Sequence, residues 1–336
     1  MNKKTLTISA VIILLVVIVA CAFSSSLLNV WSPQGRTEPV FNYNFAGISL
    51  HSLLSEEAQF VNDTDVNWIR IDIFEDVNSS IVNAKSYGFK VLGILDSWTM
   101  NYALNFTITE WTNNVTYYVS RYADFVDAWE IWNEPANANL TLALCNLKLV
   151  DENGSILQQN MSQIVDFYYS MTQTAYSIIR EYDPEADIVL FGGLNLWSGG
   201  DPHLDVDKEF AKQLAAKGIQ NYGDAISVHA YPWGKYNNIS TWENYSESLS
   251  YYKMLFPNLE FWVTETGCPE NQEGETIQAQ YLSDAYDFFQ GKVTHMFWYS
   301  LEDNSWEPDN FGLIGQNGTQ RLAYFELQKI NCKEKS

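Results

Sequence analysis

Short apolar runs alternate with longer segments of helical periodicity along most of the chain. Eight of these runs are apolar on both faces, as strands buried in a parallel sheet are. They cover residues 45–50, 67–73, 90–95, 128–133, 187–192, 225–230, 259–265 and 295–300. Helical patterns lie near residues 76–87, 110–125, 162–182, 206–217, 242–256, 276–290 and 320–330. The alternation predicts a series of βα units.

Eight βα units in about 290 residues favour an α/β fold with a single (β/α)8 TIM barrel over residues 41–331. A doubly wound sheet is the alternative, and it usually carries a glycine-rich phosphate-binding turn after its first strand. Here that position reads Ser49-Leu50-His51-Ser52, and the sequence contains no Walker A motif. We therefore expect the barrel.

The segment 136–161, after the fourth predicted strand, is long. Within it Asn153-Gly154 predicts a small β-hairpin, which either shapes one end of a cleft or only lies at the rim of the barrel.

The first 23 residues combine two positive charges with a hydrophobic run, which is typical of an export signal. Lys3 and Lys4 precede an uncharged stretch over residues 5–23, near the lower length limit for spanning a bilayer. The segment 1–23 is either a cleaved signal peptide or a retained membrane anchor, and the residues around Cys21 resemble a bacterial lipidation site. Residues 24–40 predict a linker. We expect a secreted or cell-surface protein that is glycosylated, because ten Asn-x-Ser/Thr sequons occur.

The composition narrows the range of partners. A formal net charge of −22 repels phosphate backbones and polyanionic glycans, so we expect no nucleic-acid partner. Aromatic residues make up 15% of the chain, which suits either a large core or a cleft that stacks sugar rings. The chain has no CxxC pair and no His-rich cluster, so we expect neither a metal nor a cofactor. Beyond Cys21 the cysteines are Cys145, Cys268 and Cys332, so at least one thiol stays unpaired or pairs outside the chain. We also expect a monomer.

Two acidic motifs stand at the ends of predicted strands. The segment 129–135 reads Trp-Glu-Ile-Trp-Asn-Glu-Pro and places Glu134 after the fourth strand. The segment 262–267 reads Trp-Val-Thr-Glu-Thr-Gly and places Glu265 at the end of the seventh. Side chains at the C-terminal ends of barrel strands share one mouth. A pair of carboxyl groups there can break a glycosidic bond, since one protonates the leaving oxygen while the other attacks the anomeric carbon.

These motifs resemble those of the clan A glycoside hydrolases, over residues 41 to 330. That clan includes the cellulase and mannanase group of family 5 and the β-xylosidase group of family 39. The resemblance implies a retaining hydrolase in which Glu134 is the acid/base and Glu265 the nucleophile. The eighth-strand segment from Trp298 to Asp303 looks closer to family 39, although the nucleophile motif fits no single family. Both families, and both endo and exo action, therefore stay open.

Other strand-end residues match the same clan pattern. By resemblance, Arg70 hydrogen-bonds the nucleophile and keeps it ionised, Tyr231 donates to it, and His229 lies near it. By the same resemblance, Asn133 holds the 2-hydroxyl group of the sugar, and Trp298 forms the floor beneath the sugar at the scissile bond. Each residue also has a structural alternative, as part of an ion pair, a satisfied polar group or a core ring.

Residues in the predicted βα loops are weaker candidates. Trp98 and Trp233 follow the third and sixth strands, where they either stack on sugars or pack the loops. His51 and Asp96 follow the first and third strands and are candidates for binding hydroxyl groups. The clan pattern fixes none of these four residues.

Glu130 precedes the predicted acid/base by four residues. On a regular strand, positions 130, 132 and 134 point the same way. We therefore expect Glu130 inside the barrel below the site, or in a pair with a basic group such as Arg70. Its expected role is structural.

Together these features predict a retaining glycoside hydrolase that acts on a neutral β-linked oligo- or polysaccharide of the β-glucan, mannan or xylan type. The alternative is a non-catalytic glycan-binding barrel at the cell surface. A hydrolase needs both carboxyl groups, whereas a decayed barrel usually lacks one. The presence of Glu134 and Glu265 together favours the enzyme.

Overall fold

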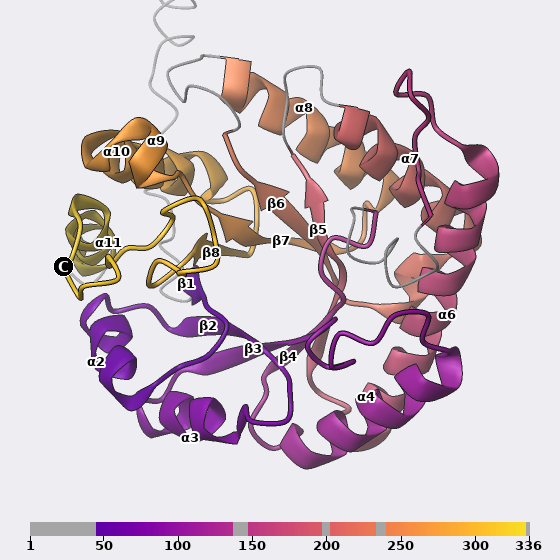
Figure 1. The fold of residues 1–336 in the computed structure, drawn as a ribbon, viewed down its shortest axis with the longest axis horizontal. Helices are drawn as coiled ribbons and strands as arrows, with labels where there is room; N and C mark the ends of the chain where they lie inside the picture. The colour runs from indigo at the N-terminus through magenta and orange to yellow at the C-terminus, as the bar shows by residue number, and fades with distance from the viewer. Residues whose placement is uncertain (1–44, 137–146, 197–201, 233–239, 334–336) are drawn as a thin grey trace, which may run out of the picture. The chain divides into compact units, whose positions relative to one another are not determined.

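The computed structural model describes residues 45–136, 147–196, 202–232 and 240–333. They form a closed barrel of eight parallel strands with helices around it (Figure 1). Each strand pairs with the next along the chain, and the eighth pairs with the first. The strands are β1 (Ala46–Ser49), β2 (Trp68–Asp72), β3 (Lys90–Leu95), β4 (Ala128–Ile131), β5 (Asp187–Asn195), β6 (Ala225–Ala230), β7 (Glu260–Thr266) and β8 (His295–Tyr299). The predicted (β/α)8 barrel is confirmed.

The helices cover the outer face of the barrel in Figure 1. They are α2 (Ser55–Asp63), α3 (Asn78–Ser86), α4 (Ile108–Tyr122), α6 (Gln158–Tyr182), α7 (Pro202–Lys217), α8 (Ser240–Leu255), α9 (Glu270–Glu273), α10 (Glu275–Phe289) and α11 (Leu322–Lys333), with a 3-10 helix η1 (Ile219–Tyr222). The sequence pattern did not predict α2. This helix has nine residues and buries only Ala58 and Val61, too few for a recognisable apolar stripe.

The strands separate two cores, because successive side chains point to opposite faces. One face joins the helices in the larger core. The other face fills the barrel with an inner cluster of Trp68, Leu92, Ala128, Val189, Ala225, Trp262 and Phe297. Arg70 and Glu130 follow Trp68 and Ala128 by two residues, so they share this inner face nearer the C-terminal mouth. The inner cluster thus closes the barrel below and leaves polar side chains at the mouth.

Several predictions fall on segments around the barrel. Val150 and Ile156 form an antiparallel bridge around Gly154, which confirms the predicted hairpin. Cys268 is a buried free thiol. Within the described ranges no helix is both long and apolar enough to span a bilayer. The predictions for segments 1–23 and 24–40, and for Cys145 and Trp233, lie outside the described residues.

Candidate active site

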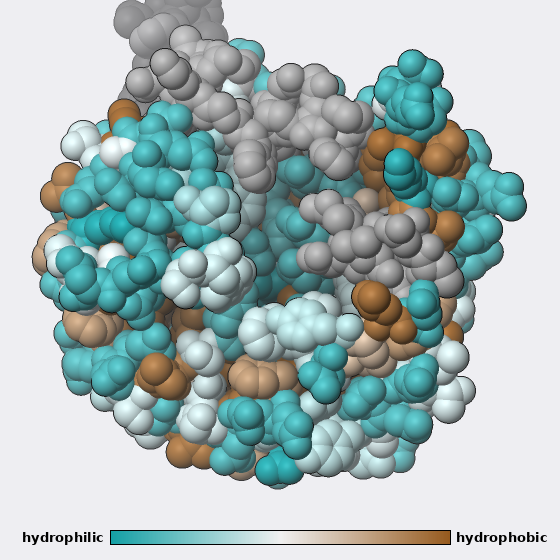
Figure 2. Space-filling view, in the orientation of Figure 1, coloured by the Kyte–Doolittle hydropathy of each residue, from teal (hydrophilic) through white to brown (hydrophobic). Residues whose placement is uncertain are grey.

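A pocket of about 530 Å³ lies at the C-terminal mouth of the barrel. Figure 2 shows a hollow there with hydrophilic side chains in it. Its volume falls within the range of roughly 300–1,000 Å³ that is usual for small-molecule sites. The predicted site residues and candidates that line it are His51, Arg70, Asp96, Trp98, Asn133, Glu134, Tyr231 and Glu265. His229 and Trp298 are not among its lining residues.

Glu265 at the end of β7 is held by two donors. Arg70 Nη1 donates to Glu265 Oε1 at 2.7 Å, and the Tyr231 hydroxyl donates to Oε2 at 2.7 Å. Burial alone would raise the pKa of Glu265, but the charges of His229 and Arg70 and the Tyr231 hydrogen bond lower it below its usual value. The site therefore keeps this carboxylate ionised, as a nucleophile must be.

We expect the lowered pKa of Glu265 to appear in the pH dependence of activity. The predicted nucleophile must be ionised, so the acid limb of the kcat/KM profile should lie below the ordinary glutamate pKa of about 4.3. Replacing Tyr231 with Phe removes one donor to Glu265 and should move this acid limb to higher pH. Measuring kcat/KM from pH 3 to pH 8 for both proteins tests this. An acid limb at the same pH in the Tyr231→Phe protein would contradict the assigned cause.

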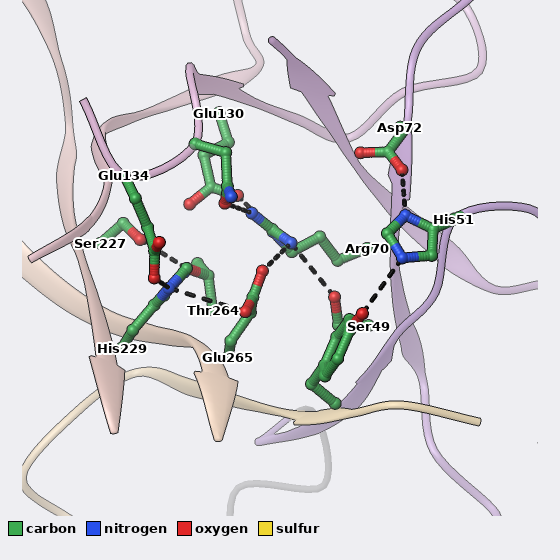
Figure 3. A network of polar contacts seen from close by, with 12 residues as sticks. Ser49, His51, Arg70, Asp72, Glu130, Glu134, Ser227, His229, Thr264 and Glu265 are labelled. Carbon is green, nitrogen blue, oxygen red and sulfur yellow. Dashed lines mark hydrogen bonds and ion pairs between the residues drawn. The ribbon is translucent and has the colours of Figure 1, made fainter. Parts of the chain in front are cut away.

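Arg70 is the centre of a buried polar network (Figure 3). Its Nε donates to Glu130 Oε2 at 2.5 Å, and its Nη2 donates to Asn133 Oδ1 at 3.0 Å. Its Nη1 also donates to Ser49 Oγ at 3.1 Å. Burial opposes the charge of Arg70, but Glu130 and Glu265 raise its pKa, so the guanidinium stays charged. The expected contacts of Arg70 with Glu265 and with Glu130 are therefore both present.

Replacing Arg70 with Met should destabilise the fold strongly. Glu130 is fully buried and would lose its cation, and breaking one side of a buried ion pair costs about 3–5 kcal/mol. The free energy of unfolding in urea measures the loss. Lys85→Met is the control, because the Lys85–Asp127 pair is about one-third exposed and such pairs contribute about 1 kcal/mol or less. Equal losses in the two variants would contradict the structural role of Arg70.

His229 on β6 connects the two predicted catalytic carboxylates. Its Nδ1 lies 3.0 Å from Glu134 Oε1 and 3.6 Å from Glu265 Oε2. Burial would lower the pKa of His229, but the charge of Glu265 and the hydrogen bond to Glu134 raise it. Glu134 Oε1 and Glu265 Oε2 both lie close to His229 Nδ1. The distance between these two oxygens therefore cannot exceed the sum of their distances to that nitrogen. His229 is buried behind the pocket and acts on the carboxylates from there.

The backbone at the end of β4 turns Asn133 and Glu134 towards the pocket. Trp132 and Glu134 have φ values of 67° and 45°, and the Glu134 amide donates to the Gly192 carbonyl at 2.7 Å. A Cβ atom on Gly192 would lie 1.8 Å from the Trp132 carbonyl oxygen, so only glycine fits there. The close approach of β5 thus supports the position of Glu134, a role that the sequence reasoning missed.

The left-handed turn corrects one expectation. Positions 130, 132 and 134 do not point the same way, because the regular strand ends at Ile131. Glu130 points into the barrel and pairs with Arg70 as expected. Trp132 instead packs in the outer core, with its ring centroid 5.8 Å from that of Trp111 on α4.

Trp298 does not form the floor of the pocket. Its side chain is 1% exposed, packs 6.1 Å from the Tyr281 ring of α10 and donates Nε1–H to the Phe311 carbonyl at 3.1 Å. On β8 the alternation directs Phe297 and Tyr299 inward and Trp298 outward. Tyr299 lines the pocket where Trp298 was expected.

A chain of hydrogen bonds runs along the side of the pocket formed by β1, β2 and β8. Figure 3 shows His51 and Asp72 across Arg70 from Glu134. His51 Nδ1 lies 2.5 Å from Asp72 Oδ2, and Nε2 lies 3.2 Å from the Tyr299 hydroxyl. The Tyr299 hydroxyl donates its single proton to Glu307. With Tyr299 donating to Glu307, Nε2 of His51 is the donor to Tyr299, and a second proton on Nδ1 can serve Asp72, so the arrangement favours the protonated ring.

The environment of His51 agrees with this charge. Burial opposes it, but the hydrogen bond and charge of Asp72 raise the pKa of His51. The Trp98 and Trp306 ring centroids lie 5.9 and 5.0 Å from that of His51.

Sequence reasoning missed Asp72 and Glu307. The spacing Arg70-Ile71-Asp72 was the available signal for Asp72, since residues two apart share a strand face.

No protein-family model matches the sequence. No curated protein matches it. A family 39 glycoside hydrolase from the gut symbiont Bacteroides cellulosilyticus WH2 matches the structure with a TM-score of 0.60 and 18% identity, over 85% of this chain and 63% of its own. A glucosidase from Croceicoccus marinus matches with a TM-score of 0.65 and 14% identity, over 88% of this chain and 69% of its own.

A β-glucuronidase from Bacteroides uniformis matches with a TM-score of 0.63 and 12% identity. The match covers 85% of this chain and 35% of the β-glucuronidase. The chain thus spans less than two thirds of the length of the family 39 hydrolase and of the β-glucuronidase. The chain has the fold of the clan A glycoside hydrolases.

Proposed function

We propose that the protein is a retaining β-glycoside hydrolase, with Glu265 as the nucleophile and Glu134 as the acid/base. The observation that carries this proposal is the pair of carboxylates just after β4 and on β7, both within 3.6 Å of His229 Nδ1 at the mouth of the barrel. The nearest oxygens of the two carboxylates therefore lie no farther apart than about 6.5 Å. This is the lower end of the roughly 6.5–9.5 Å range that is typical of inverting enzymes. A bound of this size admits the shorter spacing of retaining enzymes, and the retaining assignment itself rests on the resemblance of the two motifs to those of clan A.

The first half of the reaction forms a bond from Glu265 to the sugar. The ionised carboxylate of Glu265 attacks the anomeric carbon as the bond to the leaving oxygen breaks, and Glu134 gives its proton to that oxygen. Arg70 and Tyr231 fix the orientation of the attacking carboxylate. Asn133 is held by Arg70 beside Glu134, and we assign it to the 2-hydroxyl group, as the resemblance to clan A implies.

The second half returns the enzyme to its starting state. Glu134, now ionised, takes a proton from water while the water oxygen attacks the anomeric carbon. The bond to Glu265 breaks, its carboxylate is released, and the sugar leaves with its original anomeric configuration. His229 is within ion-pair distance of both carboxylates, so it can stabilise whichever one is charged.

The substrate that we propose is a neutral β-linked oligo- or polysaccharide of the β-glucan, mannan or xylan type. Acidic side chains outnumber basic ones around the pocket, and Trp98 and Trp306 offer ring faces for sugars. Both features suit an uncharged ligand that is rich in hydroxyl groups.

A panel of p-nitrophenyl β-glycosides with soluble β-glucan, mannan and xylan tests the proposal. The full chain should hydrolyse at least one of them, and the Glu134→Gln and Glu265→Gln proteins should not hydrolyse the polysaccharide. Equal glycan binding by all three proteins, without hydrolysis by any, would instead favour a non-catalytic binding barrel.

A further inference from the structure

Asp96 is a buried carboxyl group in the pocket that the proposed mechanism does not use. It follows β3, is 5% exposed and lines the cavity. Its Oδ1 accepts a hydrogen bond from the Trp98 amide at 2.8 Å. Its other oxygen has no hydrogen-bond partner among the residues that the structure describes. This oxygen is open to the cavity rather than fully buried, so a hydroxyl group of a ligand can reach it.

The neighbours of Asp96 make this end of the pocket acidic. Asp72 pairs with Ile94, two residues before Asp96, so Asp72 and Asp96 follow the same inner face. Glu307 adds a third carboxyl group, and the imidazolium of His51 neutralises only part of this charge. Burial and the charge of Asp72 already raise the pKa of Asp96 well above its usual value.

This combination suits a sugar that carries hydroxyl groups and no charge. A hydroxyl group both donates and accepts, so it can pair with Asp96 in either protonation state. A sugar carboxylate would bring a further negative charge beside buried acidic groups, and like charges in contact disfavour binding strongly. Arg70 cannot offset this charge, because it is already paired with Glu130 and Glu265.

We propose that Asp96 is a specificity-determining residue whose second oxygen binds a hydroxyl group of the sugar bonded to Glu265 during the reaction, while the surrounding acidic groups exclude a sugar that carries a carboxylate. The inference rests on the proposed hydrolase function, because that function places the sugar in this pocket. A β-glucuronidase shares this barrel fold. The fold therefore does not decide the charge of the sugar, and the side chains of the pocket do.

Calorimetric binding of sugar lactams tests this selectivity without turnover. The probes are the neutral δ-lactams of glucose, mannose and galactose, each beside a counterpart with a carboxylate at C6. The protein should bind at least one neutral lactam at least about 100-fold more tightly than its counterpart. Binding of the carboxylate form with equal or higher affinity, or no binding of any neutral lactam, would overturn the proposal.

An Asp96→Asn variant assigns the selectivity to one residue. Asparagine keeps the size and the oxygen that accepts from the Trp98 amide, but it cannot ionise and its amide can donate to a carboxylate. The preference for the neutral lactam should fall at least about tenfold. Asp183→Asn is the matched control, since Asp183 also bonds a tryptophan N–H, from Trp129 at 2.9 Å, but does not line the pocket.

The outcomes separate this inference from the proposed reaction. An unchanged preference in Asp96→Asn, or an equal change in Asp183→Asn, would overturn the role of Asp96. A protein that shows the expected lactam preference but hydrolyses no glycoside would support the recognition role and contradict the hydrolase. A protein that hydrolyses glucosides but binds both lactams of a pair equally would support the hydrolase and contradict this inference.

Discussion

Replacing Glu265 with Gln should lower kcat by about 10⁴-fold or more, because the amide cannot form the covalent bond to the sugar. The fold should be retained. The amide oxygen can still accept from Arg70 or Tyr231, and strand-end site residues contribute little to the core. The measurements are kcat on the best p-nitrophenyl glycoside and the thermal unfolding midpoint.

Glu260→Gln is the control for this prediction. Glu260 begins the same strand, β7, and is exposed at the opposite end of the barrel. Its replacement should leave kcat unchanged. If Glu265→Gln kept substantial activity, or if it unfolded at a much lower temperature than the Glu260→Gln protein, Glu265 would not be the nucleophile.

Replacing Glu134 with Gln should lower kcat/KM by about 10²–10⁴-fold for substrates with a poor leaving group. Such a leaving group needs the proton that Glu134 supplies. A dinitrophenolate leaves without a proton, so its glycoside should lose much less activity in the first step. The comparison of kcat/KM for an oligosaccharide and for the dinitrophenyl glycoside of the same sugar measures this difference.

Azide provides a second readout on Glu134. Glu134→Gln lacks the base that activates water, and azide attacks without a base. Added azide should therefore speed turnover of the dinitrophenyl glycoside and give a β-glycosyl azide. Equal losses for both leaving groups, together with no azide product, would rule out Glu134 as the acid/base.

The sequence was sufficient to predict the barrel and most of the contacts around Glu265. The strands are buried on both faces, which gives clear apolar runs, and polar residues at their ends mark the mouth. Arg70, Asn133, Glu134, Tyr231 and Glu265 all stand at such ends and line one pocket. The resemblance to the clan A glycoside hydrolases implied the contacts of Arg70 and Tyr231 with Glu265, and the structure contains both.

Local backbone geometry set the limit on the remaining predictions. The run Phe297-Trp298-Tyr299 is aromatic throughout, so polarity gives no sign of which ring points inward. Trp132 points outward because the backbone takes a left-handed turn there, and that turn depends on space left by Gly192 on a different strand. The alternation of apolar and polar residues in the β4 sequence does not predict that contact.

The contacts that link Asp72, His51, Tyr299 and Glu307 were not predicted, although His51 itself was a candidate. His51 and Tyr299 are 248 residues apart, and their contact depends on the pairing of β1 with β8. The side chains that we assign to sugar selectivity are therefore brought together by the closure of the barrel.

Mass spectrometry of a trapped intermediate tests the central claim most directly. A 2-deoxy-2-fluoro glycosyl fluoride of the sugar that the protein hydrolyses best slows both steps and lets the covalent adduct accumulate. Our account predicts one added fluorosugar per chain, on the peptide that contains Glu265, and no adduct on the Glu265→Gln protein. An adduct on another residue, or rapid hydrolysis of natural substrates with inversion and no adduct, would contradict it.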